Sequence, residues 1–495
     1  MHRSPALATC VFALVLASCA GRGPVDPADQ ARNAGTDVPT RVAAVDELWA
    51  RDRATDHEGA RESLKRLAWQ AGITAQVRVR AIQLLVADPA DENHADSRNM
   101  LRLMLPTEPN MLVITAISRA AEQGGWSDLT PALIRSYSRK TDPPPDPQRP
   151  ERAALLAIHP GKSIEQIAFD QFLAPLVGAG AELDRSTKAR AAAWELLSRL
   201  DADGSRRAQL LAGHSGASDH PAINDLRACA ADLRCIPLTA AQLDWLAALR
   251  DFRDPSTAPA RQAWWQEAAA CVAALPADRL EGWALRHVAP LAWARAHRPD
   301  LLSLDRAALA SALREQFRGR AIAVRGDADR GGGELFADRA GTLCWGELLA
   351  IAVADLAVRD PAVATALAGQ VQRDRADTST EYGGILGWAR ASSGGGAWRA
   401  LLYTPRPGQR GGDNQFTPPP EMLAEGARDP FHYHFHVQRD ENRDYAGPGP
   451  GDLQFADAHG RANLVFTTIR TGVLNADYYA AGGVIVDLGH VTFGP

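Results

Sequence analysis

Apolar residues recur at helical spacing through the first two-thirds of the chain, and short alternating runs replace this spacing towards the C-terminus. From about residue 41 to 320, Pro, Gly or Asp separates most of the periodic segments, as is typical at helix ends. The first helices are predicted at Val42–Arg51, Ala60–Gln70, Gln76–Ala87, Ala95–Leu105, Met111–Gln123 and Leu129–Ser138. Tryptophan-rich helices are predicted at Leu243–Arg250, Arg261–Leu275 and Leu280–Ala296, with the tryptophans in the core.

Two of these helical segments share a local pattern. Residues 77–85 and 189–197 both read as a small or apolar residue, Arg, two residues, Ala, three residues and Leu, with the arginines at Arg78 and Arg190. This pattern resembles the second helix of HEAT-type repeats, in which paired helices stack into a solenoid. Because the period is irregular, residues 41–325 are predicted to form either a HEAT-like repeat domain or an irregular helical bundle.

The residues after Arg325–Gly333 have a different character, and this Gly-rich segment is the clearest predicted domain boundary. Two helices, Cys344–Val358 and Pro361–Arg373, are followed by several short runs with the composition of strands. The strands are predicted at Gly384–Ala391, Ala397–Thr404, Phe431–His436, Leu464–Ile469, Ala476–Tyr479 and Gly483–Leu488. The fold class is therefore multidomain, an all-helical region followed by an α/β domain over residues 334–495.

The N-terminus has the pattern of a targeting segment. A short basic start precedes an apolar run from Ala6 to Ala17, which is too short for a stable membrane-spanning helix. Residues 16–19, Leu-Ala-Ser-Cys, resemble the bacterial lipobox, which implies that a signal peptide of residues 1–18 is removed and that Cys19 is lipidated. Ala20 follows, so the resemblance implies an envelope protein anchored in the outer membrane and facing the periplasm. Residues 19–40 are predicted to be a flexible tether.

Composition and charge narrow the function only slightly. Hydrophobic residues make up 46% of the 495-residue chain and charged residues 23%, which is ordinary for a globular protein. A net charge of −5 gives no general attraction to nucleic acid, so no nucleic-acid partner is expected. In an oxidising compartment, Cys229 and Cys235 can close a small disulfide loop.

The strongest candidate for chemistry is the run from Phe431 to His436, in which His432, His434 and His436 alternate with aromatic residues. Side chains alternate faces along a strand, so all three imidazoles share one face and the aromatic residues the other. Imidazole is the commonest metal ligand in proteins, and two ligands at i and i+2 can reach one ion. The alternative interpretation is an exposed strand on which surface histidines happen to fall together.

Two carboxylates complete the candidate site. Asp452 follows the Gly/Pro-rich segment 446–451, which is predicted to be a rigid loop that presents its carboxylate. Glu381 opens the sequence Glu-Tyr-Gly-Gly-Ile-Leu at the start of a predicted strand, where glycines permit close approach of the backbone. A hydrolytic zinc site needs three protein ligands, an open position for water and a nearby base.

Together these residues resemble the JAMM/MPN+ metalloprotease family. The resemblance consists of a glutamate before Gly-Gly, a His-x-His about fifty residues later, and an aspartate in a Pro-rich loop. It implies a JAMM-like domain with one zinc ion held by His434, His436 and Asp452, and Glu381 as the base that deprotonates water. The alternate register would use His432 with His434. The implied activity is hydrolysis of an amide or isopeptide bond in a peptide or protein substrate of the cell envelope.

The sequence departs from the family pattern in two places. Gly449 stands where the family has a serine that steadies the tetrahedral intermediate, and loss of such a donor typically costs about 10²–10³ in rate. The interval from His436 to Asp452 is also longer than usual, which implies an enlarged loop at Val437–Tyr445. A metal-binding domain with weak or no activity is therefore an alternative.

Two further readings remain open. His434, His436, Glu441 and Gly447, with a later His459, also resemble cupin motifs, which would imply a metal enzyme built on a β-barrel. In the other alternative the protein is a non-catalytic scaffold, whose helical region binds an envelope partner and whose C-terminal domain is stabilised by metal.

Overall fold

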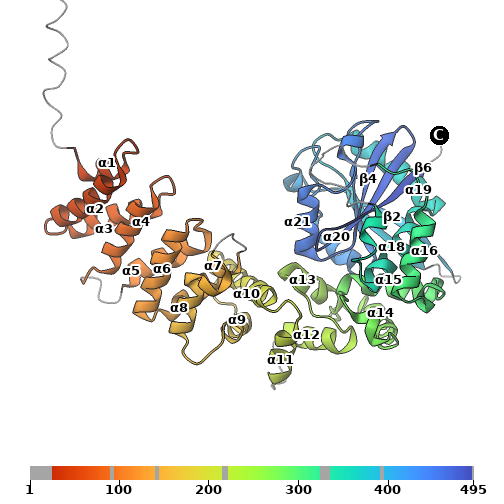
Figure 1. Ribbon diagram of the computed structural model, residues 1–495, viewed down its shortest axis with the longest axis horizontal. Helices are drawn as coiled ribbons and strands as arrows, with labels where there is room; N and C mark the ends of the chain where they lie inside the picture. Colours follow the sequence, from red (N-terminus) through yellow and green to blue (C-terminus); the bar gives the residue numbers. More distant parts are fainter. Residues whose placement is uncertain are drawn as a thin grey trace, which may run out of the picture. The chain divides into compact units, whose positions relative to one another are not determined.

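The structure, a computed structural model, describes residues 25–89, 94–139, 144–214, 221–323, 335–390 and 395–492. The chain forms two compact units, Met1–Leu196 and Leu197–Pro495, each described here by itself (Figure 1). The predicted signal peptide and the predicted lipidation site Cys19 lie outside the described residues. Among those residues, no helix combines the length and the apolar composition that crossing a membrane requires.

The first unit consists of helices that pack on one another in chain order. Helices α2, α4, α6 and α8 pack successively on one another, while α3 packs along α4. This arrangement agrees with the predicted helical region. Its helices are α1 Pro27–Arg32, α2 Val38–Asp52, α3 His57–Trp69, α4 Ala75–Val86, α5 Ala95–Met104, α6 Met111–Gly124, α7 Thr130–Ser138, α8 Pro150–Ile158, α9 Ile164–Leu173 and α10 Ala181–Leu200, which crosses the division.

A recurring arginine contact joins the helices of a pair. The guanidinium of Arg78 in α4 donates to the carbonyl of Ala68 in the last turn of α3, at 2.8 Å, and Arg190 donates to the carbonyl of Ala174 just after α9, at 2.7 Å. Arg41 makes the same kind of contact from α2 to the last turn of α1. The last carbonyls of a helix have no partner within it, so a buried arginine satisfies them. This explains why the sequence pattern repeats an arginine at this position.

The predicted tether is wrong in its second half. Residues 27–32 form α1, which packs on α2, with Ala31 fully buried. The Asp26 side chain accepts a hydrogen bond from the backbone of Ala28, and Pro27 occupies the first helical position. Both are standard helix-start signals, so this segment is ordered by local capping as well as by packing.

The second unit is built on one six-stranded mixed sheet. Its strands are β1 Gly383–Arg390, β2 Gly396–Tyr403, β3 Phe431–His436, β4 Asn463–Arg470, β5 Val473–Ala480 and β6 Val484–Thr492, in the order β2-β1-β3-β4-β5-β6. Neighbouring strands are antiparallel except β3 and β4, which are parallel. All six predicted strands are therefore confirmed, and the sheet is open, with β2 and β6 at its edges.

Helices cover both faces of this sheet (Figure 1). Helix α18 packs on β5 and β6 and α19 on β2, whereas α21 packs on β5 from the other side. The Tyr478 hydroxyl reaches Glu347 on α18, but the next residue, Tyr479, packs against Ala456 on α21. The helices of the unit are α11 Ser205–Gly213, α12 Pro221–Asp232, α13 Ala240–Leu249, α14 Ala258–Ala273, α15 Val288–His297, α16 Arg306–Phe317, α17 Phe336–Arg339, α18 Trp345–Val358, α19 Pro361–Arg375, α20 Pro420–Glu425 and α21 Pro450–His459.

The compact units differ from the predicted domains. The predicted boundary, 325–333, lies outside the described residues, and the division falls at Leu196–Leu197 instead. Helices α11 to α16 belong to the same unit as the sheet. On α13, the Trp245 indole donates to the carbonyl of Ala427 at 2.7 Å, just before β3, and on α15 the Trp293 ring packs against Trp398 of β2. The prediction that these tryptophans are core residues is confirmed for Trp245, Trp265 and Trp283.

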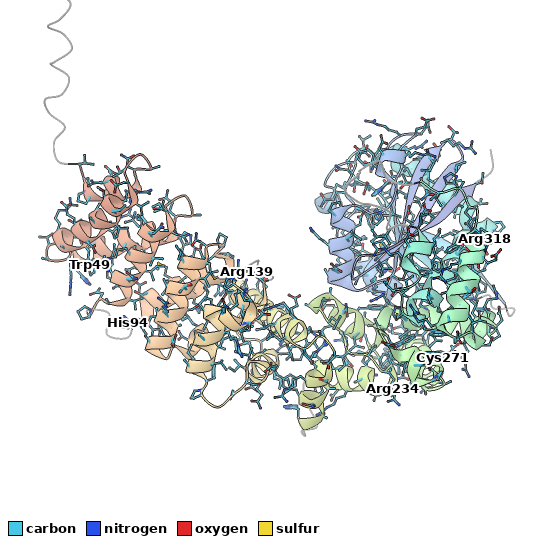
Figure 2. All side chains as sticks on the ribbon, in the orientation of Figure 1. Trp49, His94, Arg139, Arg234, Cys271 and Arg318 are labelled. Atoms are coloured by element: carbon cyan, nitrogen blue, oxygen red, sulfur yellow. The ribbon has the colours of Figure 1, made fainter. Side chains whose placement is uncertain are left out.

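The two cysteines predicted to form a disulfide face each other as free thiols. Cys229 and Cys235 are buried, with their sulfur atoms 3.7 Å apart, which is longer than a covalent S–S bond of about 2 Å. Arg234 in the intervening turn has a φ of 55°, a conformation that non-glycine residues seldom adopt (Figure 2). The disulfide therefore stays a prediction for an oxidising environment.

We expect Arg78 to be one of the most important residues for the stability of the first unit. Besides the contact with α3, its guanidinium pairs with the buried carboxylate of Glu108. Replacing Arg78 with Met leaves that carboxylate unpaired and should lower the free energy of unfolding by about 3–5 kcal/mol, measured by urea denaturation. The matched control is Arg80→Met, because Arg80 pairs with Asp46 at the surface and should cost less than about 1 kcal/mol. Equal losses in the two variants would contradict this assignment.

Candidate metal centre

Strand β3 carries the imidazoles into the interior of the second unit. It lies between β1 and β4 in the sheet, and His432 and His434 are each 3% exposed. The opposite face packs under α19, where the Tyr433 hydroxyl donates to the Gln370 side chain at 2.5 Å. The predicted alternation of faces is correct, and the alternative of histidines on an exposed strand is wrong.

His434 and His436 point their Nε2 atoms at one place. These two nitrogens are 3.3 Å apart. The Nδ1 of His436 donates to the carbonyl of Tyr445 at 2.9 Å, so in the neutral ring the lone pair is on Nε2. The Nδ1 of His434 lies 3.3 Å from the hydroxyl of Tyr479. Ligand histidines in metalloproteins are held in this way, with one nitrogen hydrogen-bonded and the other directed at the metal.

Asp452 reaches the same place from α21. Its Oδ1 lies 3.2 Å from the Nε2 of His434, and its Oδ2 lies 3.6 Å from the Nε2 of His436. Sequence analysis placed Asp452 in a rigid loop, but it lies in the first turn of a helix that begins with Pro450. Its Oδ2 also accepts the backbone N–H of Gly449 at 2.6 Å, as acidic residues in the first helical turn commonly do.

Glu381 completes the cluster from the segment before β1. Glu381, His434 and His436 can each offer one ligand atom such that all three atoms lie within 4.8 Å of one another. The carboxylate is 3% exposed, and its Oε1 accepts a hydrogen bond from the side chain of Gln438 at 2.7 Å. The four residues predicted from the sequence as the site therefore converge.

The electrostatics of this cluster suit a bound cation. Burial raises the pKa of Glu381 to about 8, and the carboxylates of Asp452 and Asp374 act in the same direction. Burial also opposes the charge of Asp452, but His434 and His436 outweigh it and hold the pKa of Asp452 well below its usual value. For His434, burial is outweighed by Asp452 and the other carboxylates, so its pKa is raised. Two buried carboxyl groups, Glu381 and Asp374, and the half-buried Asp452 near two imidazoles form an environment that a divalent ion would stabilise.

His432, the alternate ligand, lies apart from the cluster. It is fully buried near Arg461 and His459, and burial lowers its pKa well below the usual value. Neither of its ring nitrogens has a hydrogen-bond partner. The structure thus brings His434 and His436 together with Glu381 and Asp452, and it does not bring His432 with them.

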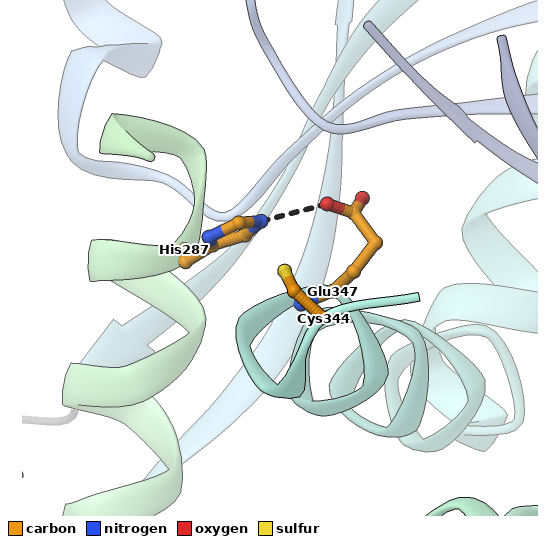
Figure 3. Close-up of side chains that lie close together, drawn as sticks. All are labelled: His287, Cys344 and Glu347. Atoms are coloured by element: carbon orange, nitrogen blue, oxygen red, sulfur yellow. Dashed lines mark hydrogen bonds and ion pairs between the residues drawn. The ribbon is translucent and has the colours of Figure 1, made fainter. Parts of the chain in front are cut away.

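A second group with possible ligand atoms within 4.8 Å consists of His287, Cys344 and Glu347 (Figure 3). The Nδ1 of His287 accepts the backbone N–H of Ala284 at 3.0 Å, so its Nε2 carries the hydrogen and donates to Glu347 at 2.7 Å. Arg286 also lies 2.9 Å from the Glu347 carboxylate. A metal would have to displace both contacts of the ring and compete with a guanidinium, so we interpret this group as a buried ion pair.

Sequence reasoning missed the residues that support the ligands. Gln438, Asn442 and Tyr479 all contact the cluster or its immediate neighbours. Gln438 and Asn442 lie in the segment that was identified only as an enlarged loop. Tyr479 is on the same face of the sheet as His434, and the alternation of β5 could have indicated that face once strand pairing was known.

The cupin reading loses its structural basis here. It would place Glu441 and His459 with the histidine pair inside a β-barrel, but the described sheet is open and mixed. Among the described residues, Glu441 is in neither of the side-chain groups that could hold a metal ion.

Comparison of the chain with protein-family models, curated proteins and solved structures finds no match.

Proposed function

We propose that this protein is a lipid-anchored envelope protein whose C-terminal α/β region is a zinc-dependent hydrolase of amide or isopeptide bonds. The observation that carries this proposal is the convergence of Glu381, His434, His436 and Asp452 from three segments of the chain. It agrees with the roles that the JAMM-like resemblance implies for these same residues.

The donor set fits zinc. Two imidazole nitrogens and one carboxylate are the ligands of many catalytic zinc sites, which keep a fourth position open. His436 already has the tautomer that a ligand needs, because its Nδ1 is occupied by the Tyr445 carbonyl. Zinc bound there would supply a Lewis acid that acidifies water and polarises a carbonyl group.

Glu381 is the proposed general base. One carboxylate oxygen, Oε1, is held by Gln438, so Oε2 is left to accept a proton from the attacking water. The water oxygen forms the new C–O bond, the C–N bond breaks, and Glu381 returns the proton to the leaving nitrogen. Its raised pKa suits a group that must both accept and release a proton near neutral pH.

The location and the partners rest on the sequence. Lipidation at Cys19 would attach the protein to the membrane, in the outer membrane facing the periplasm, and the substrate would be a peptide or protein of the envelope. No nucleic-acid partner is proposed, given the net charge of −5.

A non-catalytic scaffold remains the second candidate. A specific feature favours it, namely a groove of about 680 Å³ in the first unit, lined by residues of α2, α4 and α6 that include Val79, Leu112 and Arg119. Such a groove is large enough for a segment of a partner protein. In this reading the metal centre only stabilises the second unit.

Metal analysis tests the centre itself. Purified protein should contain close to one zinc per chain, and His434→Ala should reduce this to trace amounts, because one of three ligands is lost. His432→Gln is the matched control, since that residue lies outside the cluster and should leave the zinc content unchanged. Zinc that is lost in both the His432 and the His434 variants would support the alternate register, which uses these two histidines, and zinc that persists in the His434 variant would contradict the proposed centre.

The base is tested by Glu381→Gln, which keeps the shape of the side chain but cannot accept a proton. We expect the zinc content to be retained. Turnover of peptide and lysine-linked isopeptide substrates, measured as the release of free amine, should fall by a factor of about 10²–10⁴. A variant that keeps full biological function and zinc content would favour the scaffold, and an unchanged rate of hydrolysis would mean that Glu381 is not the base.

Gly449→Ser restores the hydroxyl that the resemblance leads one to expect. The glycine has an extended backbone, with φ −76°, and an added Cβ would first meet the Asp452 carboxylate at 3.4 Å, so the side chain fits. If oxyanion stabilisation is limiting, the rate should rise by about 10²–10³. Gly451→Ser, where an added Cβ meets nothing within 4 Å, is the control and should leave the rate unchanged. An unchanged rate for Gly449→Ser would mean that another group already stabilises the oxyanion.

A further inference from the structure

Gln438 occupies a central position beside the proposed base. Its Nε2 donates to the Oε1 of Glu381 at 2.7 Å and to the backbone carbonyl of Asp413 at 2.5 Å. Its Oε1 accepts from the side-chain amide of Asn442 at 2.7 Å. The Nε2 of Gln438 thus has two acceptors as partners and its Oε1 has one donor, so the orientation of this side-chain amide is fixed. A glutamate at this position could not make the same contacts.

Asn442 ties this amide to the ligand strand. Its Nδ2 also donates to the backbone carbonyl of His436 at 3.1 Å, and its own backbone N–H donates to Thr468 at 2.8 Å. The side chain of Asn442 is buried, with the residue 4% exposed. Glu381 is therefore connected through two amides to the strand that carries the histidines.

The hydrogen bonds of Gln438 hold the Glu381 carboxylate close to the histidine pair. A ligand atom of Glu381 lies within 4.8 Å of those of His434 and His436, so this carboxylate is close enough to join the ligands unless another contact holds it. Four protein ligands make a closed, structural zinc site, whereas catalysis needs an open position. The contact that keeps the Glu381 carboxylate out of the metal coordination therefore decides whether the site is structural or catalytic.

We infer that Gln438 is a positioning residue that holds Glu381 beside the metal ligands and prevents it from becoming a fourth ligand. This inference rests on the proposed metal centre, but it does not need the proposed hydrolysis. Asn442 supports it by orienting the Gln438 amide. The consequence is that loss of Gln438 should lower turnover without weakening metal binding.

The experiment uses the full chain with Gln438→Ala, loaded with Co²⁺ as a spectroscopic probe and with Zn²⁺ for affinity. We expect the visible Co²⁺ absorption to change, because Glu381 enters the coordination, and Zn²⁺ to bind at least as tightly as in the wild type in competition with a chelator. The double variant Gln438→Ala/Glu381→Ala should give the spectrum of Glu381→Ala alone. Turnover should fall about 10–100-fold in kcat with little change in KM.

Gln415→Ala is the matched control. Gln415 contacts Glu381 only through its backbone carbonyl, which the substitution retains, so spectrum, affinity and turnover should match the wild type. A Gln438→Ala protein that is folded by circular dichroism and has wild-type spectrum and affinity would overturn the inference. A changed spectrum in a protein whose wild type hydrolyses nothing would uphold the inference and overturn the proposed hydrolase. Absence of Co²⁺ and Zn²⁺ binding in the wild type would overturn both.

Discussion

The parallel pairing of β3 with β4 is the constraint on which the candidate site depends. Every other neighbouring pair in the sheet is antiparallel, but two adjacent parallel strands need a connection that crosses one face of the sheet. Helix α21 is that connection, and it packs on the imidazole face. Its first turn therefore ends above His434 and His436, which is how Asp452 comes to lie within 3.6 Å of both rings.

This arrangement places several ionisable side chains close together in a site with little exposure to solvent. Burial disfavours ionised Glu381 and Asp452. The nearby imidazoles and the hydrogen bonds from Gln438 and the Gly449 backbone act in the opposite direction. Protein interiors tolerate such groups when they are paired or bind metal. The group around Glu347 differs, because there the Arg286 guanidinium already neutralises the carboxylate and neutral His287 donates a hydrogen bond to it, which leaves no role for a cation. The same residue types thus form an ion pair in one place and a candidate metal centre in another.

In the first unit, buried polar contacts also fix how the elements pack. Buried arginines such as Arg41 and Arg78 satisfy carbonyl groups that a helix end leaves without partners, and they thereby fix how the second helix of a pair lies against the first. In the second unit, Trp245 joins α13 to the segments that precede β3 and β4, through its indole N–H and its ring. This contact explains why helices that look like part of the preceding helical region belong to the sheet-bearing unit.

The sequence by itself determined the elements and the chemistry of the site. Strand alternation placed the imidazoles on one face, and the residue types of Glu381, His434, His436 and Asp452 indicated a metal. Only the tertiary structure decided which histidines act together, because that depends on where α21 crosses the sheet. It also decided that Gln438 and similar polar residues in the intervening loop support the cluster. Local periodicity reports which face a side chain occupies, but contacts between segments far apart in the chain depend on strand order and packing.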